Sequence, residues 1–174
     1  MGANRFITPE FAFGSHLPVL IKALSITDGP VLEMGMGMSS SITMHWMCAT
    51  SKRQLVSYEN DHEFFRFARK YNCDFHHVVC LDDWSKADID RPWDVALIDH
   101  SPAERRIVDI KRLANLAKYL VVHDVEGRRN MFYHYDQIWP LFKWKYSYNN
   151  YLPKTAVLSN LVDLTGFTVN FHES

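Results

Sequence analysis

The stretch VLEMGMGMSSS, residues 31–41, decides the fold of this chain. A short apolar run reaches Glu33 and is followed by Gly35, Met36 and Gly37, and then by three serines. Glycine adopts backbone conformations that other residues avoid, so the pattern predicts a buried strand, a sharp turn and a helix N-terminus. Main-chain N–H groups in such a turn can approach a ligand closely, and Glu33 adds an acceptor. The stretch therefore predicts a site for a nucleoside-bearing cofactor.

Length and composition limit the class of protein. The chain has 174 residues, of which 47% are hydrophobic, and this is enough for the core of one domain. Nineteen basic residues against twenty acidic residues give a net charge of -1, so nucleic acid is not favoured as a partner. No apolar run approaches the ~18 residues that span a bilayer. No membrane partner is expected.

The cysteines and the N-terminal sequence bear on localisation. Cys48, Cys73 and Cys80 are an odd number without C-x-x-C spacing, which fits free thiols in a reducing compartment. The N-terminal sequence MGANRF lacks the pattern of a signal peptide. A cytoplasmic protein is the expectation.

Apolar runs alternate with amphipathic stretches along the chain. After the strand at the glycine turn, further strands are predicted at residues 54–60, 76–82, 93–99 and 119–124. Helices are predicted at residues 16–25, 40–50, 61–72, 103–118 and 129–142. This alternation predicts a mostly parallel sheet with helices on both faces, in which ligands bind at the carboxyl ends of the strands.

The last third of the chain departs from this alternation. Residues 143–150 and 154–164 are predicted as strands, and the three residues between them are too few for a helical crossover. The pair should form an antiparallel hairpin. We expect a single domain over residues 1–174, made of an N-terminal segment and helix (1–28), a cofactor-binding core (29–126), and a helix with the terminal hairpin (127–174).

A G-x-G turn alone does not identify the cofactor, because nicotinamide, flavin and S-adenosylmethionine proteins all use one. In the dinucleotide fingerprint a third glycine lies three residues after the second, and here that residue is Ser40. Glu33 would repel a pyrophosphate but could accept a hydrogen bond from the ammonium group of a methionine. The residues thus favour S-adenosylmethionine over NAD or NADP.

The chain resembles the class I S-adenosylmethionine-dependent methyltransferases. The resemblance is carried by LEMGMG, LVSYEN, VALIDHSPAERR and VVHD, together with the terminal hairpin, and it covers roughly residues 16–165. It implies a Rossmann-like, doubly wound α/β fold with a mostly parallel seven-stranded sheet, helices on both faces and a C-terminal antiparallel hairpin. The activity it implies is methyl transfer to an oxygen or nitrogen of an acceptor.

The resemblance also implies site residues at the strand ends. The methionine portion would lie against residues of the glycine turn: Glu33, Gly35, Gly37, Ser39 and Ser40. Glu59, about 20 residues beyond Gly37, would accept hydrogen bonds from the two ribose hydroxyls. Asp82 or Asp83 would bind the adenine amino group, with Trp84 offering a face for the ring. Asp99 and His100 would lie beside the sulfonium and the incoming nucleophile.

Two routes of catalysis remain open. Catechol-type members of the family bind Mg²⁺ through an Asp at each of two strand ends and a following Asn. Asp99 and Asp124 match the two acidic positions, but Val125 stands where the Asn would be, so a divalent cation is doubtful. Without a metal, His100 or His123 could act as general base beside Asp124.

Other residues near these strand ends have less specific roles. His16 could fold over the same cleft, although a surface position is favoured. Arg105 and Arg106 could reach an anionic substrate, although charges at the start of a surface helix are more often solvated. The predicted partner is a small-molecule acceptor, with a sugar as one candidate, and a homodimer is one way to complete its pocket.

Two other functions are alternatives. One is a nicotinamide-dependent oxidoreductase on a Rossmann sheet, which would be stabilised thermally by NAD or NADP. The other is a nucleoside-binding or assembly module without catalysis.

Overall fold

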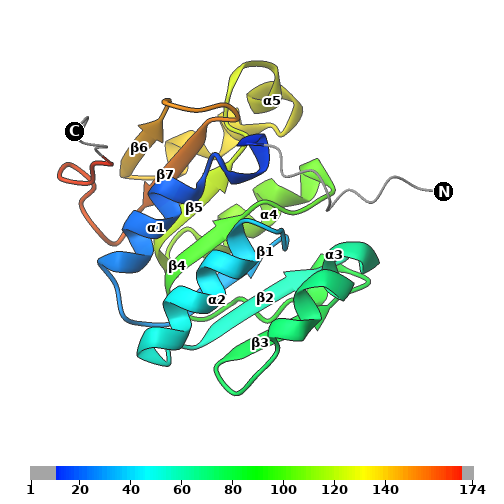
Figure 1. Ribbon diagram of the computed structural model, residues 1–174. Coiled ribbons are helices and arrows are strands. Elements are labelled where there is room, and N and C mark those ends of the chain that lie inside the picture. Colours follow the sequence, from blue (N-terminus) through cyan, green and yellow to red (C-terminus); the bar gives the residue numbers. More distant parts are fainter. Residues whose placement is uncertain (1–10, 170–174) are drawn as a thin grey trace.

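The computed structural model describes residues 11–169, which form one seven-stranded sheet in the order β3-β2-β1-β4-β5-β7-β6 (Figure 1). The strands are β1 (Val31–Met34), β2 (Leu55–Glu59), β3 (His76–Cys80), β4 (Trp93–Ile98), β5 (Ala117–His123), β6 (Trp144–Tyr148) and β7 (Thr155–Ser159). The first five strands pair in parallel. β7 runs antiparallel between β5 and β6, so the predicted terminal hairpin and the predicted fold class are confirmed.

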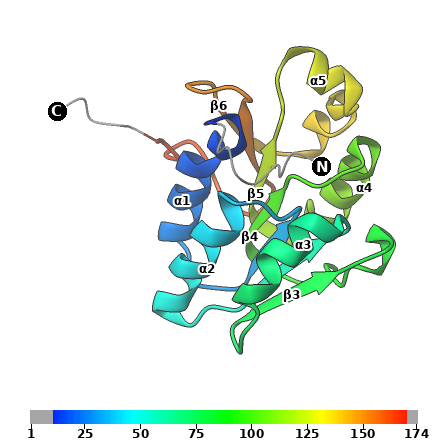
Figure 2. The same ribbon diagram turned by 45° about the vertical axis from the view of Figure 1, so that its right-hand side comes forward.

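Helices cover both faces of the sheet (Figures 1 and 2). The described α-helices are α1 (Leu17–Ser25), α2 (Ser40–Ser51), α3 (His62–Ala68), α4 (Ala103–Leu113) and α5 (Gly127–Phe132), of which α5 projects beyond the sheet. Apolar side chains of α1 and α2, including Leu20 and Met44, form one buried cluster with the sheet. Ile110 and Leu113 of α4 belong to a second cluster, which contains the alternate side chains of the central strands. Each central strand is therefore buried on both faces, as its unbroken apolar sequence predicts.

The predicted element boundaries differ most from the structure at three places. The predicted helix 103–118 ends at Leu113, and Ala117 already pairs with Trp93 in the sheet. The predicted helix 129–142 is α5 followed by two 3₁₀ turns, because His134 is left-handed at φ 55° and Pro140 lacks the N–H that a helix needs. The predicted strand 154–164 ends at Ser159, whose Oγ accepts hydrogen bonds from the next turn.

The glycine turn lies where the sheet order reverses, between β1 and its neighbours β2 and β4. Gly35 has φ +93°, and a Cβ there would lie 2.6 Å from the backbone of Asp99 and His100. The Gly35 position thus needs glycine for its conformation and for the close approach of the turn to the end of β4. Side chains at the ends of β1, β2, β4 and β5 consequently share one edge of the molecule.

Within residues 11–169, no helix is long and apolar enough to cross a membrane.

Candidate functional site

The N–H groups at the start of the glycine turn are bonded within the protein. Gly35 N donates to Tyr58 O at 3.0 Å. Met36 N donates to Glu59 Oε2 at 2.8 Å, and Gly37 N donates to Ser41 Oγ at 3.0 Å. These bonds tie the turn to β2 and α2. The turn is therefore preformed. Its first N–H groups are already bonded within the protein, so a ligand would fit against the surface of the turn.

Glu33 lies beneath this turn and is fully buried. Its carboxyl group accepts hydrogen bonds from Ser41 Oγ at 2.9 Å and from Ser57 Oγ at 2.6 Å. Burial raises the pKa of Glu33 to about 7, although these hydroxyl donors oppose the increase. Contact between Glu33 and a methionine ammonium remains a prediction, and it would require access past Ser41 or through a water.

A chain of polar groups extends from Glu33 toward the surface. Ser57 Oγ lies 2.9 Å from Nε2 of the buried His76, and His76 Nδ1 lies 3.0 Å from Nδ1 of His45 on α2. Burial lowers the pKa of His76 to about 4, so its ring is neutral. Neutral partners therefore satisfy Glu33, in agreement with its raised pKa.

Glu59 connects the end of β2 to the glycine turn. Its Oε1 accepts hydrogen bonds from Asn60 N and Asp61 N, and its Oε2 accepts one from Met36 N. Burial raises the pKa of Glu59, and the backbone donors oppose the increase. Each carboxylate oxygen has two acceptor positions, so one position remains on Oε2 for a ribose hydroxyl.

The residues predicted around adenine differ in exposure. Asp82 is exposed and pairs with Lys86 Nζ at 2.7 Å, while Asp83 caps the following 3₁₀ turn by accepting from Ser85 N at 2.8 Å. Trp84 is 3% exposed and donates its indole N–H to Ser101 O at 2.7 Å. Its ring belongs to the core, so the expectation that Trp84 offers an open face to adenine does not fit this arrangement.

Gly37, Ser39 and Ser40 begin α2. A Cβ at Gly37 would meet only Ser40 Oγ, at 3.6 Å, so the packing of the protein does not itself demand glycine there. Ser39 is the N-cap residue of α2 and Ser40 is buried in its first turn. The remaining reason for a glycine at position 37 is the close approach of a ligand to its backbone.

A second group of polar side chains lies at the ends of β4 and β5. Asp99 Oδ1 is 3.1 Å from His123 Nδ1 and 3.0 Å from Arg106 Nη2. Removal from water raises the pKa of Asp99, but attraction to His123 and Arg106 outweighs it and holds the pKa well below the usual range. Burial opposes charge on His123, but Asp99 raises its pKa above the usual value. Asp99 and His123 thus form an ion pair.

The hydrogen bonds of His123 also favour the charged ring. Ser15 Oγ lies 2.7 Å from Pro153 O, and only the hydroxyl can donate in that contact. Ser15 Oγ therefore accepts from His123 Nε2 at 2.9 Å, while Nδ1 donates to Asp99. A ring that donates from both nitrogens has no lone pair for a proton, which argues against His123 as general base in this arrangement.

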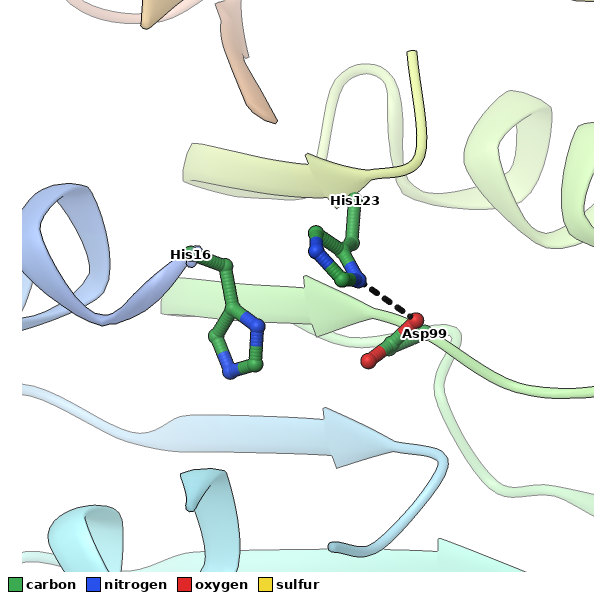
Figure 3. Close-up of side chains that lie close together, drawn as sticks. All are labelled: His16, Asp99 and His123. Atoms are coloured by element: carbon green, nitrogen blue, oxygen red, sulfur yellow. Dashed lines mark hydrogen bonds and ion pairs between the residues drawn. The ribbon is translucent and has the colours of Figure 1, made fainter. Parts of the chain in front are cut away.

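His16 lies beside His123, with the ring centroids 4.8 Å apart (Figure 3). It is 1% exposed, so the predicted surface position is wrong: the residues before α1 place the ring over the ends of β4 and β5. Neither ring nitrogen of His16 finds a hydrogen-bond partner within residues 11–169. Burial lowers the pKa of His16 to about 4, so the ring is neutral.

His100 and Asp124 were both predicted as catalytic, and the structure gives them other contacts. His100 is buried, with its ring centroid 4.3 Å from that of Trp84 and its Nε2 3.2 Å from Asp109 Oδ2. Asp124 adopts φ 63° and lies 3.3 Å from Arg106 Nη1. Neither residue belongs to the His16–Asp99–His123 group, which among the described residues is the set close enough to share a metal ion.

Arg106 connects these groups, a role that the sequence did not predict for it. Its guanidinium is 4% exposed in relative terms and binds Asp99, Asp124 and the main-chain oxygen of His100. The expectation that it is solvated is wrong, whereas the neighbouring Arg105 is partly exposed and pairs with Asp109. The spacing along α4 could have indicated this burial, because the buried residues form one stripe of the helix: Arg106, Asp109, Ile110 and Leu113. Two charges at core positions of an amphipathic helix indicate buried ion pairs.

Comparison with known proteins identifies the fold. No protein-family model matches the chain, and no curated protein matches it in sequence. Solved structures do match. Cofactor-bound Rv0187 from MTB has a TM-score of 0.64 at 17% identity, covering 89% of this chain and 82% of that one. The human methyltransferase 10 domain containing protein has a TM-score of 0.62 at 12% identity, covering 89% and 84%.

A third match corrects an earlier expectation. The human Mettl16 catalytic domain, solved in complex with the MAT2A 3'UTR hairpin 1, has a TM-score of 0.62 at 10% identity and covers 92% of this chain and 73% of that one. A protein with this fold therefore binds RNA, and the prediction that nucleic acid is not favoured was wrong. Net charge averages the whole surface and does not describe one face of it. The chain has the Rossmann-like fold of class I methyltransferases.

Proposed function

We propose that this chain is an S-adenosylmethionine-dependent methyltransferase that transfers a methyl group to an oxygen or nitrogen nucleophile. The observation that carries the proposal is the position of β7, which runs antiparallel between β5 and β6 in a sheet whose glycine turn follows β1. The dinucleotide-binding Rossmann sheet continues in parallel at this edge. The arrangement thus favours a methyl donor over a nicotinamide cofactor.

The residues of the glycine turn fit this donor. A Cβ at Gly37 would make only an ordinary contact with Ser40 Oγ, Ser40 replaces the third glycine of a pyrophosphate site, and Glu59 keeps an acceptor position on Oε2. In the proposal Gly35 and Gly37 border the methionine portion, and Glu59 accepts from the ribose. Asp82 or Asp83 remains the candidate for the adenine amino group.

When bound, S-adenosylmethionine supplies an electrophilic methyl group on a positively charged sulfur. Gly35 brings the glycine turn against the backbone of Asp99, so the donor side and the Asp99–His123 pair are adjacent. In the proposal the nucleophile lies by Asp99, which is the partly exposed member of that pair. Arg106 fixes the carboxylate by binding Oδ1, and this pre-organises the site.

The test is direct binding by isothermal titration calorimetry. S-adenosylmethionine, S-adenosylhomocysteine and NAD are titrated separately into the purified protein. We expect the first two to bind and NAD not to bind. We also expect Glu59→Gln to weaken the binding of S-adenosylhomocysteine at least about tenfold, because an amide offers one acceptor oxygen where the carboxylate offers two.

Asp61→Asn is the matched control. Asp61 lies two residues from Glu59 and caps α3, a role that asparagine also fills, so this variant should bind like the wild type. Failure of both adenosyl compounds to bind would overturn the proposed function. Binding that Glu59→Gln leaves unchanged would remove Glu59 from the site and keep the donor assignment.

A further inference from the structure

Three potential metal ligands from distant parts of the chain meet beside the proposed donor site. His16 precedes α1, Asp99 follows β4, and His123 ends β5 (Figure 3). One ligand atom from each residue can be chosen so that all three lie within 4.8 Å of one another. Two imidazoles and one carboxylate are a ligand set that holds divalent transition metals and leaves positions open.

His16 supplies an independent reason to expect a ligand. Its ring is 1% exposed, and within the described chain neither nitrogen has a hydrogen-bond partner. A buried polar group without a partner destabilises a fold by about 1–3 kcal/mol, so its retention needs a cause. Figure 3 shows the ring directed toward the space between His123 and Asp99. A bound cation would satisfy one nitrogen there.

His123 is oriented as a metal-binding histidine is. Ser15 Oγ, itself fixed on Pro153 O, lies 2.9 Å from Nε2, and this leaves Nδ1 directed at Asp99. Metal-bound histidines generally donate the other ring N–H to such a partner, which fixes the ring and its tautomer. Ser15 is therefore a positioning residue for His123.

Asp99 retains a free oxygen for the same centre. Arg106 and His123 both bind Oδ1, and Oδ2 makes no hydrogen bond within residues 11–169. The positive charge of Arg106 is shared with Asp124, 3.3 Å away. The charge of Asp99 is thus not cancelled by Arg106 alone.

We propose that His16, Asp99 and His123 bind one divalent transition-metal ion of the Zn²⁺ or Co²⁺ class. Ligands of a tetrahedral zinc lie roughly 3.4 Å apart, so the group must contract slightly. The contact of His123 Nδ1 with Asp99 Oδ1 measures 3.1 Å, and the ion would take the place of the proton that Nδ1 donates there. No hydrogen bond from the described residues holds the ring of His16 against rotation. The set differs from the Asp99 and Asp124 pair because it adds two nitrogen ligands, which disfavours Mg²⁺.

The open positions of this ion would receive the oxygen or nitrogen of the methyl acceptor and lower its pKa. This role rests on the proposed function, whereas metal binding does not. The test therefore measures metal and donor separately.

The experiment is a Co²⁺ titration of chelator-treated protein, followed by visible absorption and by competition with Zn²⁺. We expect one equivalent of Co²⁺ with visible d–d bands, displacement by Zn²⁺, and no displacement by Mg²⁺ at equal concentration. His16→Ala should weaken Co²⁺ at least about 100-fold. Ser15→Ala should weaken it about 10–100-fold, the effect typical of a lost partner of a metal-bound histidine.

His45→Ala is the matched control, because His45 forms the other close histidine pair, with His76, and should leave Co²⁺ binding unchanged. X-ray absorption of the Zn²⁺-loaded wild type should show two imidazole ligands, so the test does not depend on a variant that folds. Absence of stoichiometric binding, fewer than two imidazoles, or unchanged binding in His16→Ala would each overturn the proposal.

S-adenosylhomocysteine is titrated into the same chelator-treated protein. If it binds and Co²⁺ does not, the metal site fails and the proposed function stands. If Co²⁺ binds and S-adenosylhomocysteine does not, the metal site stands and the proposed function fails.

Discussion

Glu33 and Asp99 are acidic residues at the same edge of the sheet, and their surroundings hold them in opposite states. Glu33 is fully buried, is bonded by neutral serine hydroxyls, and has its pKa raised to about 7 by burial. Asp99 is partly exposed and faces His123 and Arg106, whose charges hold its pKa well below the usual range despite removal from water.

The comparison shows that the β1–β2 end mainly supports the glycine turn, whereas the β4–β5 end has the features of a reactive site. At the β1–β2 end, main-chain N–H and serine hydroxyl groups bond the carboxyl groups of Glu33 and Glu59, and these bonds support the glycine turn while one acceptor position remains on Glu59 Oε2. At the β4–β5 end, the charges of Arg106 on α4 and His123 on β5 converge on the carboxylate of Asp99, which is partly exposed. Substitutions at the two ends should therefore have different consequences.

The largest effect is expected for Arg106→Met. Loss of the guanidinium leaves Asp99 and Asp124 with His123 as their one remaining positive neighbour among the described residues, and removing one partner of such a network destabilises a fold by about 3 kcal/mol or more. The midpoint temperature of thermal unfolding should fall by roughly 6–12 °C in a protein of this size.

Arg105→Met serves as the control for that variant. Arg105 is partly exposed, and its partner Asp109 keeps Arg112 at 3.1 Å, so a loss near 1 kcal/mol is expected. Equal losses in the two variants would contradict the distinction between the buried network and the helix surface.

Gly35→Ala should come next and should act on folding. A methyl group would lie 2.6 Å from the backbone at Asp99, on a residue with φ +93°, so we expect a loss of about 2–4 kcal/mol in the free energy of unfolding. Denaturant titration measures it.

Gly37→Ala tests the other glycine of the turn. The added methyl group fits within the protein, so the free energy of unfolding should stay within about 1 kcal/mol of the wild type. The variant should lose affinity for S-adenosylhomocysteine. A stable Gly35→Ala, or a Gly37→Ala with normal affinity, would reverse the roles assigned to the two glycines.

The pH dependence of stability tests the state of Glu33. Its pKa rises from 4.5 in the unfolded chain to about 7 in the fold, so the folded state holds the proton more tightly. The resulting stabilisation is fully present below pH 4.5 and is lost as the pH rises through 7. It amounts to about 3 kcal/mol at most.

The measurement compares wild type with Glu33→Gln by denaturant titration from pH 4.5 to 8. The glutamine variant carries no titrating group at this position, so the wild type should lose stability relative to it as the pH rises. Parallel curves would show that Glu33 has an ordinary pKa.

The smallest effect is expected for Ser57→Ala. Its hydroxyl donates to Glu33 at 2.6 Å and receives the neighbouring N–H of His76, so its loss should destabilise the fold by about 1 kcal/mol. Because the Ser57 hydroxyl opposes the raised pKa of Glu33, the pH at which stability is lost should move upward. A downward movement would contradict this contact.

Sequence patterns predicted features that depend on neighbouring residues. The strand VLEM, the glycine turn and helix α2 follow one another, and α3 begins within the predicted helix 61–72, where Asp61 caps it by accepting from Glu63 N at 2.7 Å. The hairpin was predictable because three residues cannot hold a crossover helix. The end of α4 was not, because only pairing of Ala117 with Trp93 in the sheet decides where β5 begins.

The sequence by itself determined the order of strands and helices, the terminal hairpin and the place of the glycine turn, because periodicity, glycine and short links act locally. Tertiary structure alone decided which polar groups meet. It buried His16 and Arg106, turned His100 toward Asp109, and directed His123 to Asp99. Those contacts join residues as far apart in sequence as Ser15 and His123, and no local pattern encodes the packing that brings them within 2.9 Å.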